Sequence, residues 1–113
     1  MNLPRGDQAL VEQAKVRNYL LSASHPIGRF KAEFFRSIGY TDQNWARFNS
    51  DLCALAVTGE AMAIAATAYG QKYEVRGTLT GPSGRTAKVV TVWIILKDDA
   101  FPRLVTAYPG VDA

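Results

Sequence analysis

The residues best suited to chemistry lie in one short stretch, residues 25–35, which reads HPIGRFKAEFF. It holds the chain's single histidine, then a Pro and a Gly that interrupt regular structure, then a short aromatic-rich helix. Helical spacing places Lys31 on the apolar face, beside Phe34 and Phe35. A cation there is desolvated, and the dipole at the start of a helix opposes it. Either the aliphatic stem of Lys31 packs on the apolar face while its ammonium reaches water, or Lys31 points into a site that holds an anion.

The composition is that of one globular domain over residues 1–113, with 48% hydrophobic and 20% charged residues. A net charge of +3 permits a nucleic acid as partner without requiring it. One cysteine allows no internal disulfide, which fits the cytoplasm, and we interpret Cys53 as a small core residue. The sequence has neither a run of membrane-spanning length nor a signal-peptide core, so we expect no membrane partner. If the domain leaves its cell, another segment or machine must carry it.

The first half of the chain shows helical periodicity. Three helices are predicted, over residues 12–21, 28–38 and 41–59. Gly39 is expected to end the second helix, and Thr41 to cap the third. Before them, Arg5-Gly6-Asp7 is interpreted as the turn of a small hairpin between residues 1–3 and 9–11.

After Gly70 the pattern changes to the alternation of strands. Three strands are predicted, over residues 71–80, 85–96 and 102–108. Residues 60–69 are Ala-rich and stay open between a helix tail, a loop and a fourth strand. Helices followed by an antiparallel meander of three or four strands predict an α+β domain, with the helices packed on one face of a small sheet.

The turns suggest a register in which Thr80 lies opposite Arg85, and Ile95 opposite Leu104. One face then carries an apolar set for the helices: Tyr73, Val75, Leu79, Val90, Val92, Ile94, Val105 and Ala107. The other face carries Glu74, Arg76, Thr78, Thr91, Trp93, Thr106 and Tyr108. Its hydroxyls, guanidinium and aromatic surface suit a phosphate and a base. Such residues are also typical of any half-exposed antiparallel face.

Several segments resemble an uncharacterised bacterial family: LPRGD, YLLSASHPIGRFKAEFFRSIGY, YGQKYEVRGTLTGPSGR, VWII and PRLVTAYP. The resemblance covers almost the whole chain, and the His–Pro–Gly–Lys–Ala segment is its distinctive part. Related domains occur alone, often beside small partner genes, and as the C-terminal tips of large secreted bacterial toxins. Those tips are similar to the superfamily of barnase, EndoU, colicin-type nucleases and RelE, whose members cut RNA without a metal ion. The resemblance implies helices on one face of a small antiparallel sheet and an active site on the sheet side.

The resemblance implies RNA as the partner and attack of a ribose 2′-hydroxyl on the adjacent phosphate. His25 is suited to move the protons by its unperturbed pKa. Lys31, with the amides that begin the second helix, is suited to stabilise the oxyanion. Thr106 and Tyr108 can orient the phosphate or assist proton transfer. A histidine before a proline is also common as a turn or capping residue, and EndoU-like enzymes use a second histidine that this chain lacks.

The remaining candidates for substrate binding are Arg76 and Arg85 as contacts to the RNA backbone, Thr91, and Trp93 as a stacking surface. One His and one Cys cannot form a zinc site of usual composition. No P-loop or dinucleotide glycine pattern is present, so we expect no metal and no other cofactor.

A non-catalytic module that binds a protein or a nucleic acid is the alternative. It would place His25 and Lys31 far apart, or bury His25 among backbone partners. The likeness to toxin tips implies an inhibitor as well, an immunity or antitoxin protein. That protein is expected to be acidic, because this domain is basic. The site of action would be the cytoplasm of a target cell, reached as part of a larger protein.

Overall fold

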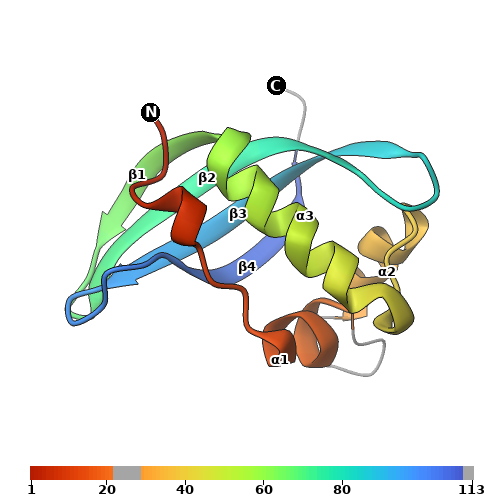
Figure 1. Ribbon diagram of the computed structural model, residues 1–113, viewed down its shortest axis with the longest axis horizontal. Coiled ribbons are helices and arrows are strands. Elements are labelled where there is room, and N and C mark those ends of the chain that lie inside the picture. Colours follow the sequence, from red (N-terminus) through yellow and green to blue (C-terminus); the bar gives the residue numbers. More distant parts are fainter. Residues whose placement is uncertain (22–28, 111–113) are drawn as a thin grey trace.

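A computed structural model describes residues 1–21 and 29–110 of the protein. The helical elements come first along the chain: η1 (Gly6–Gln8), α1 (Gln13–Lys15), η2 (Val16–Leu20), α2 (Arg29–Ser37), η3 (Asp42–Asn44) and α3 (Trp45–Thr58). The strands follow: β1 (Glu60–Ala66), β2 (Gly70–Thr80), β3 (Thr86–Leu96) and β4 (Arg103–Pro109). Helix α3 crosses one face of the sheet (Figure 1). This arrangement confirms the predicted α+β class.

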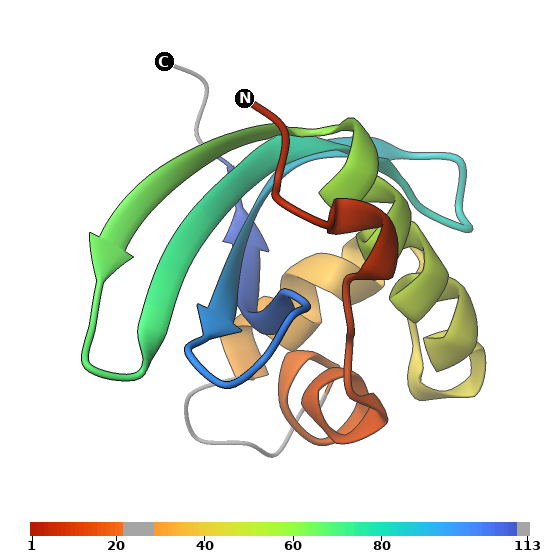
Figure 2. The same ribbon diagram turned by 60° about the vertical axis from the view of Figure 1, so that its left-hand side comes forward.

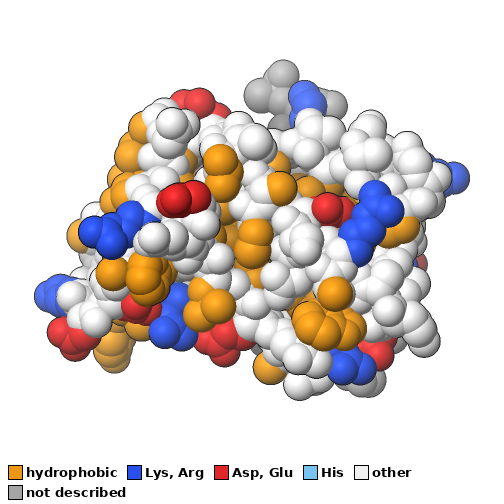
Figure 3. Space-filling view, viewed as in Figure 1, with side chains coloured by type: hydrophobic (Ala, Val, Ile, Leu, Met, Phe, Trp, Pro, Cys, Tyr) orange, Lys and Arg blue, Asp and Glu red, His pale blue; other side chains and the backbone are white. Residues whose placement is uncertain are grey.

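The sheet is an antiparallel meander in the order β1-β2-β3-β4. It is strongly curved, and the helices lie on its concave side (Figure 2). The ambiguous residues 60–69 supply the edge strand β1, in which the side chains of Met62 and Ile64 are 54% and 44% exposed. Hydrophobic side chains follow this edge at the left of Figure 3. We call the concave side the helix face of the sheet, and the opposite side the outer face.

The predicted third helix forms as η3 followed by α3. The side chain of Asn44 accepts a hydrogen bond from the Thr41 N–H at 2.7 Å and donates one to the Gly39 carbonyl at 2.9 Å. Gly39 has a φ of 107°, a left-handed conformation that glycine adopts without strain. A Cβ there would also lie 2.5 Å from the amide nitrogen of Ser83. The end of α2 therefore sits tightly against the β2–β3 turn.

The core lies between α3 and the helix face. Phe48, Leu52, Leu55 and Ala56 of α3 are buried there, and burying each large apolar side chain contributes about 1.5–3 kcal/mol. At Gly77 a Cβ would lie 2.2 Å from Leu55 Cδ1, so any larger residue there would force the Leu55 side chain to move.

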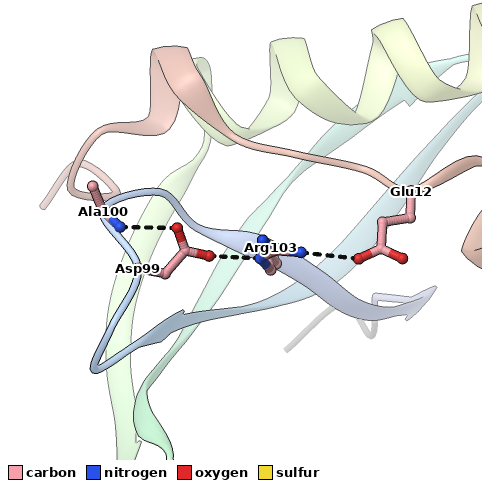
Figure 4. A network of polar contacts seen from close by, with 4 residues as sticks. All are labelled: Glu12, Asp99, Ala100 and Arg103. Atoms are coloured by element: carbon pink, nitrogen blue, oxygen red, sulfur yellow. Dashed lines mark hydrogen bonds and ion pairs between the residues drawn. The ribbon is translucent and has the colours of Figure 1, made fainter.

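The N-terminal segment differs from its prediction. Residues 1–3 and 9–11 do not form a hairpin; Leu10 instead bridges to Arg103 beside β4, with Leu10 N to Pro102 O at 2.8 Å. Arg103 fastens this junction, because its guanidinium contacts Glu12 at 3.1 Å and Asp99 at 2.6 Å (Figure 4). The hydrogen bond from Arg103 lowers the pKa of the Asp99 carboxyl. The start of β4 is thus held to the helical half of the chain.

Candidate functional site

The structure joins Lys31 and Thr106, two of the three candidate catalytic residues. Helix α2 buries Ala32 and Phe35 completely, and Lys31 is half-buried at the edge of the same face. Its Nζ donates a hydrogen bond to Thr106 Oγ1 at 2.9 Å. The lysine that helical spacing singled out therefore reaches from α2 to the last strand of the sheet.

Thr106 lies on β4 next to a β-bulge. Thr106 lies opposite Val92, whereas the next pair along β3 is Trp93 with Leu104, so Val105 has no partner in the ladder. A bulge of this kind bends the strand and turns a side chain toward a new neighbour. The bulge changes the side of Leu104, whereas Thr106 lies in the regular part of the ladder and shares the outer face with Tyr108. There the Lys31 ammonium meets its hydroxyl.

Tyr108 and Arg76 share the outer face with Thr106. Tyr108 is two residues beyond Thr106 on β4, and it pairs across the sheet with Val90, which in turn pairs with Arg76. Tyr108 is half-buried and the Arg76 side chain is 56% exposed. Arg76 Nε contacts a carboxylate oxygen of Glu74 at 2.5 Å. A guanidinium has five N–H donors, so this ion pair leaves others for a ligand.

The prediction that Thr91 and Trp93 lie on the outer face is wrong. Thr80 pairs with Thr86 instead of Arg85. This shift of one residue moves every side chain of β3 to the opposite face of the sheet from the predicted one. Both side chains consequently lie on the helix face with no solvent exposure. Trp93 Nε1 donates to Thr91 Oγ1 at 2.7 Å, and that hydroxyl donates to the Val75 carbonyl at 2.9 Å. These two residues build the core, and Trp93 offers no stacking surface to a ligand.

Of the other two candidates, Arg85 and His25, the structure describes only Arg85, which it does not bring into contact with Lys31 and Thr106. Arg85 is exposed in the β2–β3 turn, where its carbonyl accepts a hydrogen bond from the Gly81 N–H at 2.9 Å. His25 lies outside the described residues. Its distance from Lys31 therefore stays a prediction.

Sequence reasoning missed Lys88 as a surface cation and Thr78 as its neighbour. The two residues pair with each other on the outer face, and Thr78 lies two positions beyond Arg76 on β2. Arg76, Thr78 and Lys88 therefore share one corner of that face. The signal for this placement was the charge of Lys88, which a buried face would not accept.

Cys53 is half-buried on α3 and burial raises the pKa of its thiol, which disfavours the nucleophilic thiolate. Among residues 1–21 and 29–110, no group of three or more His, Cys, Asp or Glu side chains is placed to hold a metal ion. Across the same residues, no helix is long and apolar enough to span a bilayer.

Comparison with known proteins gives three results. No curated protein sequence matches the chain. The fold is similar to a chain in the structure of a contact-dependent growth inhibition toxin–immunity protein complex from Klebsiella pneumoniae 342, with a TM-score of 0.71 and 17% identity over 95% of this chain and 97% of that one. A family model matches residues 2–111, so the chain belongs to DUF6883, a family of domains of unknown function.

Proposed function

We propose that this domain is a toxin-like ribonuclease that cleaves RNA without a metal ion, with its site where α2 meets β4. The observation that carries the proposal is the contact of Lys31 Nζ with Thr106 Oγ1 at 2.9 Å. It sets a cation beside a hydroxyl on the outer face, and this pair can hold a phosphate group from two sides. Fold likeness to a chain of a toxin–immunity complex supports the toxin-like role.

The proposed reaction is an intramolecular transesterification. The ribose 2′-oxygen forms a bond to phosphorus, and the bond from phosphorus to the 5′-oxygen breaks. His25 takes part in moving a proton from the 2′-hydroxyl or to the leaving 5′-oxygen. Lys31 stabilises the negative charge that grows on the phosphoryl oxygens, while Thr106 orients them. The products are a 2′,3′-cyclic phosphate and a 5′-hydroxyl.

The test is cleavage of bacterial RNA by the purified domain in EDTA, with the new ends identified chemically. We expect cyclic phosphate ends, and a strict requirement for added Mg²⁺ would overturn the mechanism. Expression of the chain in bacteria should also slow growth unless a cognate inhibitor is present. Because the domain carries a net charge of +3, we expect that inhibitor to be acidic.

The second candidate is a non-catalytic domain that binds a protein. The likeness supports it too, because the similar structure is a complex of a toxin with an immunity protein and a shared fold leaves the role within such a pair open. The edge strand β1, in which Met62 and Ile64 are exposed, suits protein contact. Absence of cleavage of every RNA tested, together with harmless expression, would favour this candidate.

A further inference from the structure

A cavity of about 280 Å³ opens between β2, β3 and the end of β4. Its lining is Arg76, Gly77, Thr78, Lys88, Val89, Val90 and Gly110. The exposed side chains of Arg76, Thr78 and Lys88 place its polar part on the outer face. Gly110 closes one side, since its N–H donates to the Lys88 carbonyl at 2.8 Å.

The charges of this cavity distinguish it from another hollow of the molecule. None of the described residues that line it is acidic, and two are cations. A cavity of about 480 Å³ lies at the opposite end of the sheet, where Lys97 and Arg103 face Asp98 and Asp99. There two acidic side chains belong to the lining itself, and Arg103 contacts Asp99 and Glu12. At the smaller cavity the acidic partner of Arg76 is Glu74, which is not part of the lining. On the face that bears α3, Lys and Arg side chains lie singly among other residues (Figure 3).

The size and lining of the smaller cavity suit one unit of a nucleic acid chain. Pockets for whole small ligands measure roughly 300–1,000 Å³, and this cavity of about 280 Å³ lies just below that range. The guanidinium of Arg76 and the ammonium of Lys88 can bind a phosphate, and the hydroxyl of Thr78 can add a hydrogen bond. Val90 supplies an apolar surface for a ribose or base.

The cavity is in line with the Lys31–Thr106 pair. Moving along β3 and β4, Val92 pairs with Thr106, Val90 pairs with Tyr108, and the carbonyl of Lys88 binds Gly110. Each step covers two strand residues, about 7 Å. Half-buried Tyr108 stands between the two cationic positions, where its ring can stack on a base. An extended single strand matches this row of groups, whereas a duplex would hold its bases away from Tyr108.

We propose that the cavity at Arg76, Thr78 and Lys88 binds a backbone phosphate of single-stranded RNA, on the same strand whose cleaved phosphate lies at Lys31 and Thr106. This subsite rests on the proposed function. It implies that the RNA strand runs along the outer face, from the bulge of β4 toward the β2–β3 turn. Its cations hold the strand, and Lys31 and Thr106 act on it.

The test measures binding separately from cleavage. The probe is a labelled single-stranded oligonucleotide of about eight residues, within the usual site sizes, with 2′-fluoro sugars that keep an RNA-like shape but cannot attack the phosphate. The full chain is titrated at several salt concentrations by fluorescence anisotropy, in unmodified form and as Arg76→Gln, Lys88→Gln and Lys97→Gln. Lys97 is the matched control, because it is exposed and lies at the opposite end of the sheet.

We expect Arg76→Gln and Lys88→Gln each to weaken binding several-fold and to reduce the salt slope by roughly 0.7 for each phosphate that the variant no longer neutralises. Lys97→Gln should change neither. Equal losses in all three variants would mean that only net charge matters, and would overturn the subsite. Equal affinity for DNA of the same sequence, or no binding at all, would overturn it too. Weaker binding in the two variants without any cleavage of natural RNA would keep the subsite and reject the ribonuclease.

Discussion

The ammonium of Lys31 donates a hydrogen bond to the hydroxyl of Thr106 over 2.9 Å, although 75 positions separate the two residues. The contact gives a physical reason for a lysine on the apolar side of α2. Lys31 is half-buried one turn before the buried Phe35, and its charge reaches Thr106 on the outer face of β4.

Lys31→Met tests whether that charge acts on a ligand. Met keeps the length and packing of the stem and removes a half-buried cation. We expect the midpoint of thermal unfolding to hold or rise, and the rate of RNA cleavage to fall roughly 10²–10³-fold, as when an oxyanion-stabilising donor is removed. Lys97→Met, which removes an exposed charge at the other end of the sheet, should keep the full rate. Full activity in Lys31→Met would reject its role.

Thr106→Val removes the hydroxyl and keeps the branched shape. The variant cannot accept the hydrogen bond from Lys31, so the ammonium loses its contact with β4. We expect a fall in rate of about 10-fold, which corresponds to one ordinary hydrogen bond of about 1.4 kcal/mol. Thr86→Val is the control, since Thr86 is exposed at the far end of β3. A drop of the same size in both variants would show that the effect comes from the sheet and not from the site.

His25→Ala should lower the cleavage rate by roughly 10²–10⁴-fold if His25 is the general acid or base. The rate–pH profile of the unmodified chain should then have a limb that the variant lacks. If His25 is instead a turn or capping residue, the variant would unfold at a lower temperature and keep both its rate per folded molecule and the limb.

The order of the elements was predictable because local signals agree with it. Gly39 ends α2 in a left-handed conformation, as a glycine after a helix suggests. The face of β2 that carries Arg76 and the place of Lys31 on α2 followed from periodicity alone. The contact between Lys31 and Thr106 did not follow, because its distance depends on how the helix packs beyond the sheet edge.

The predicted register of β3 was wrong for a physical reason. Arg85 was assigned to the strand, but the Gly81 N–H binds its carbonyl at 2.9 Å, which makes it part of the turn. The error put Lys88 on the buried face, and the cost of burying a lone charge was reason enough to reject that register. The alternation of polar and apolar residues along β4 gives no sign that Val105 is unpaired. Because Val105 is an extra residue in the strand, Leu104 lies buried on the helix face, whereas the prediction placed it on the outer face.

Thr91→Val tests the corrected place of the buried pair. The variant keeps the volume but leaves the Trp93 indole N–H without its acceptor. A buried donor without a partner costs about 1–3 kcal/mol, and we expect this decrease in the free energy of unfolding measured with urea. The cleavage rate per folded molecule should stay unchanged. Unchanged stability together with a large fall in cleavage would restore Thr91 to the site and refute the register.

The Tyr40–Asp51 pair predicts a stability change at alkaline pH. The Tyr40 hydroxyl is in a fully buried side chain that stacks on Phe48 with ring centroids 4.4 Å apart, and it donates to Asp51 Oδ2 at 2.5 Å. Burial first, and then the hydrogen bond to the Asp51 carboxylate, raise the pKa of Tyr40 well above its usual value. The folded state therefore keeps the phenol proton where the unfolded state has begun to lose it.

The sign of the effect follows from proton counts. Above the unfolded pKa of about 10, the folded chain binds more protons than the unfolded one, so the free energy of unfolding falls as the pH rises. The stabilisation from Tyr40 is complete below about pH 10 and is lost as the pH rises toward the folded pKa.

Tyr40→Phe removes the hydroxyl and keeps the ring. Near pH 8 it should cost about 1.5–3 kcal/mol, the range for a hydrogen bond to a charged group. Urea unfolding between about pH 8 and pH 11 should show the two proteins converging, because only the unmodified chain has this proton to lose. Curves that stay parallel over that range would show that Tyr40 does not hold its proton in the folded state.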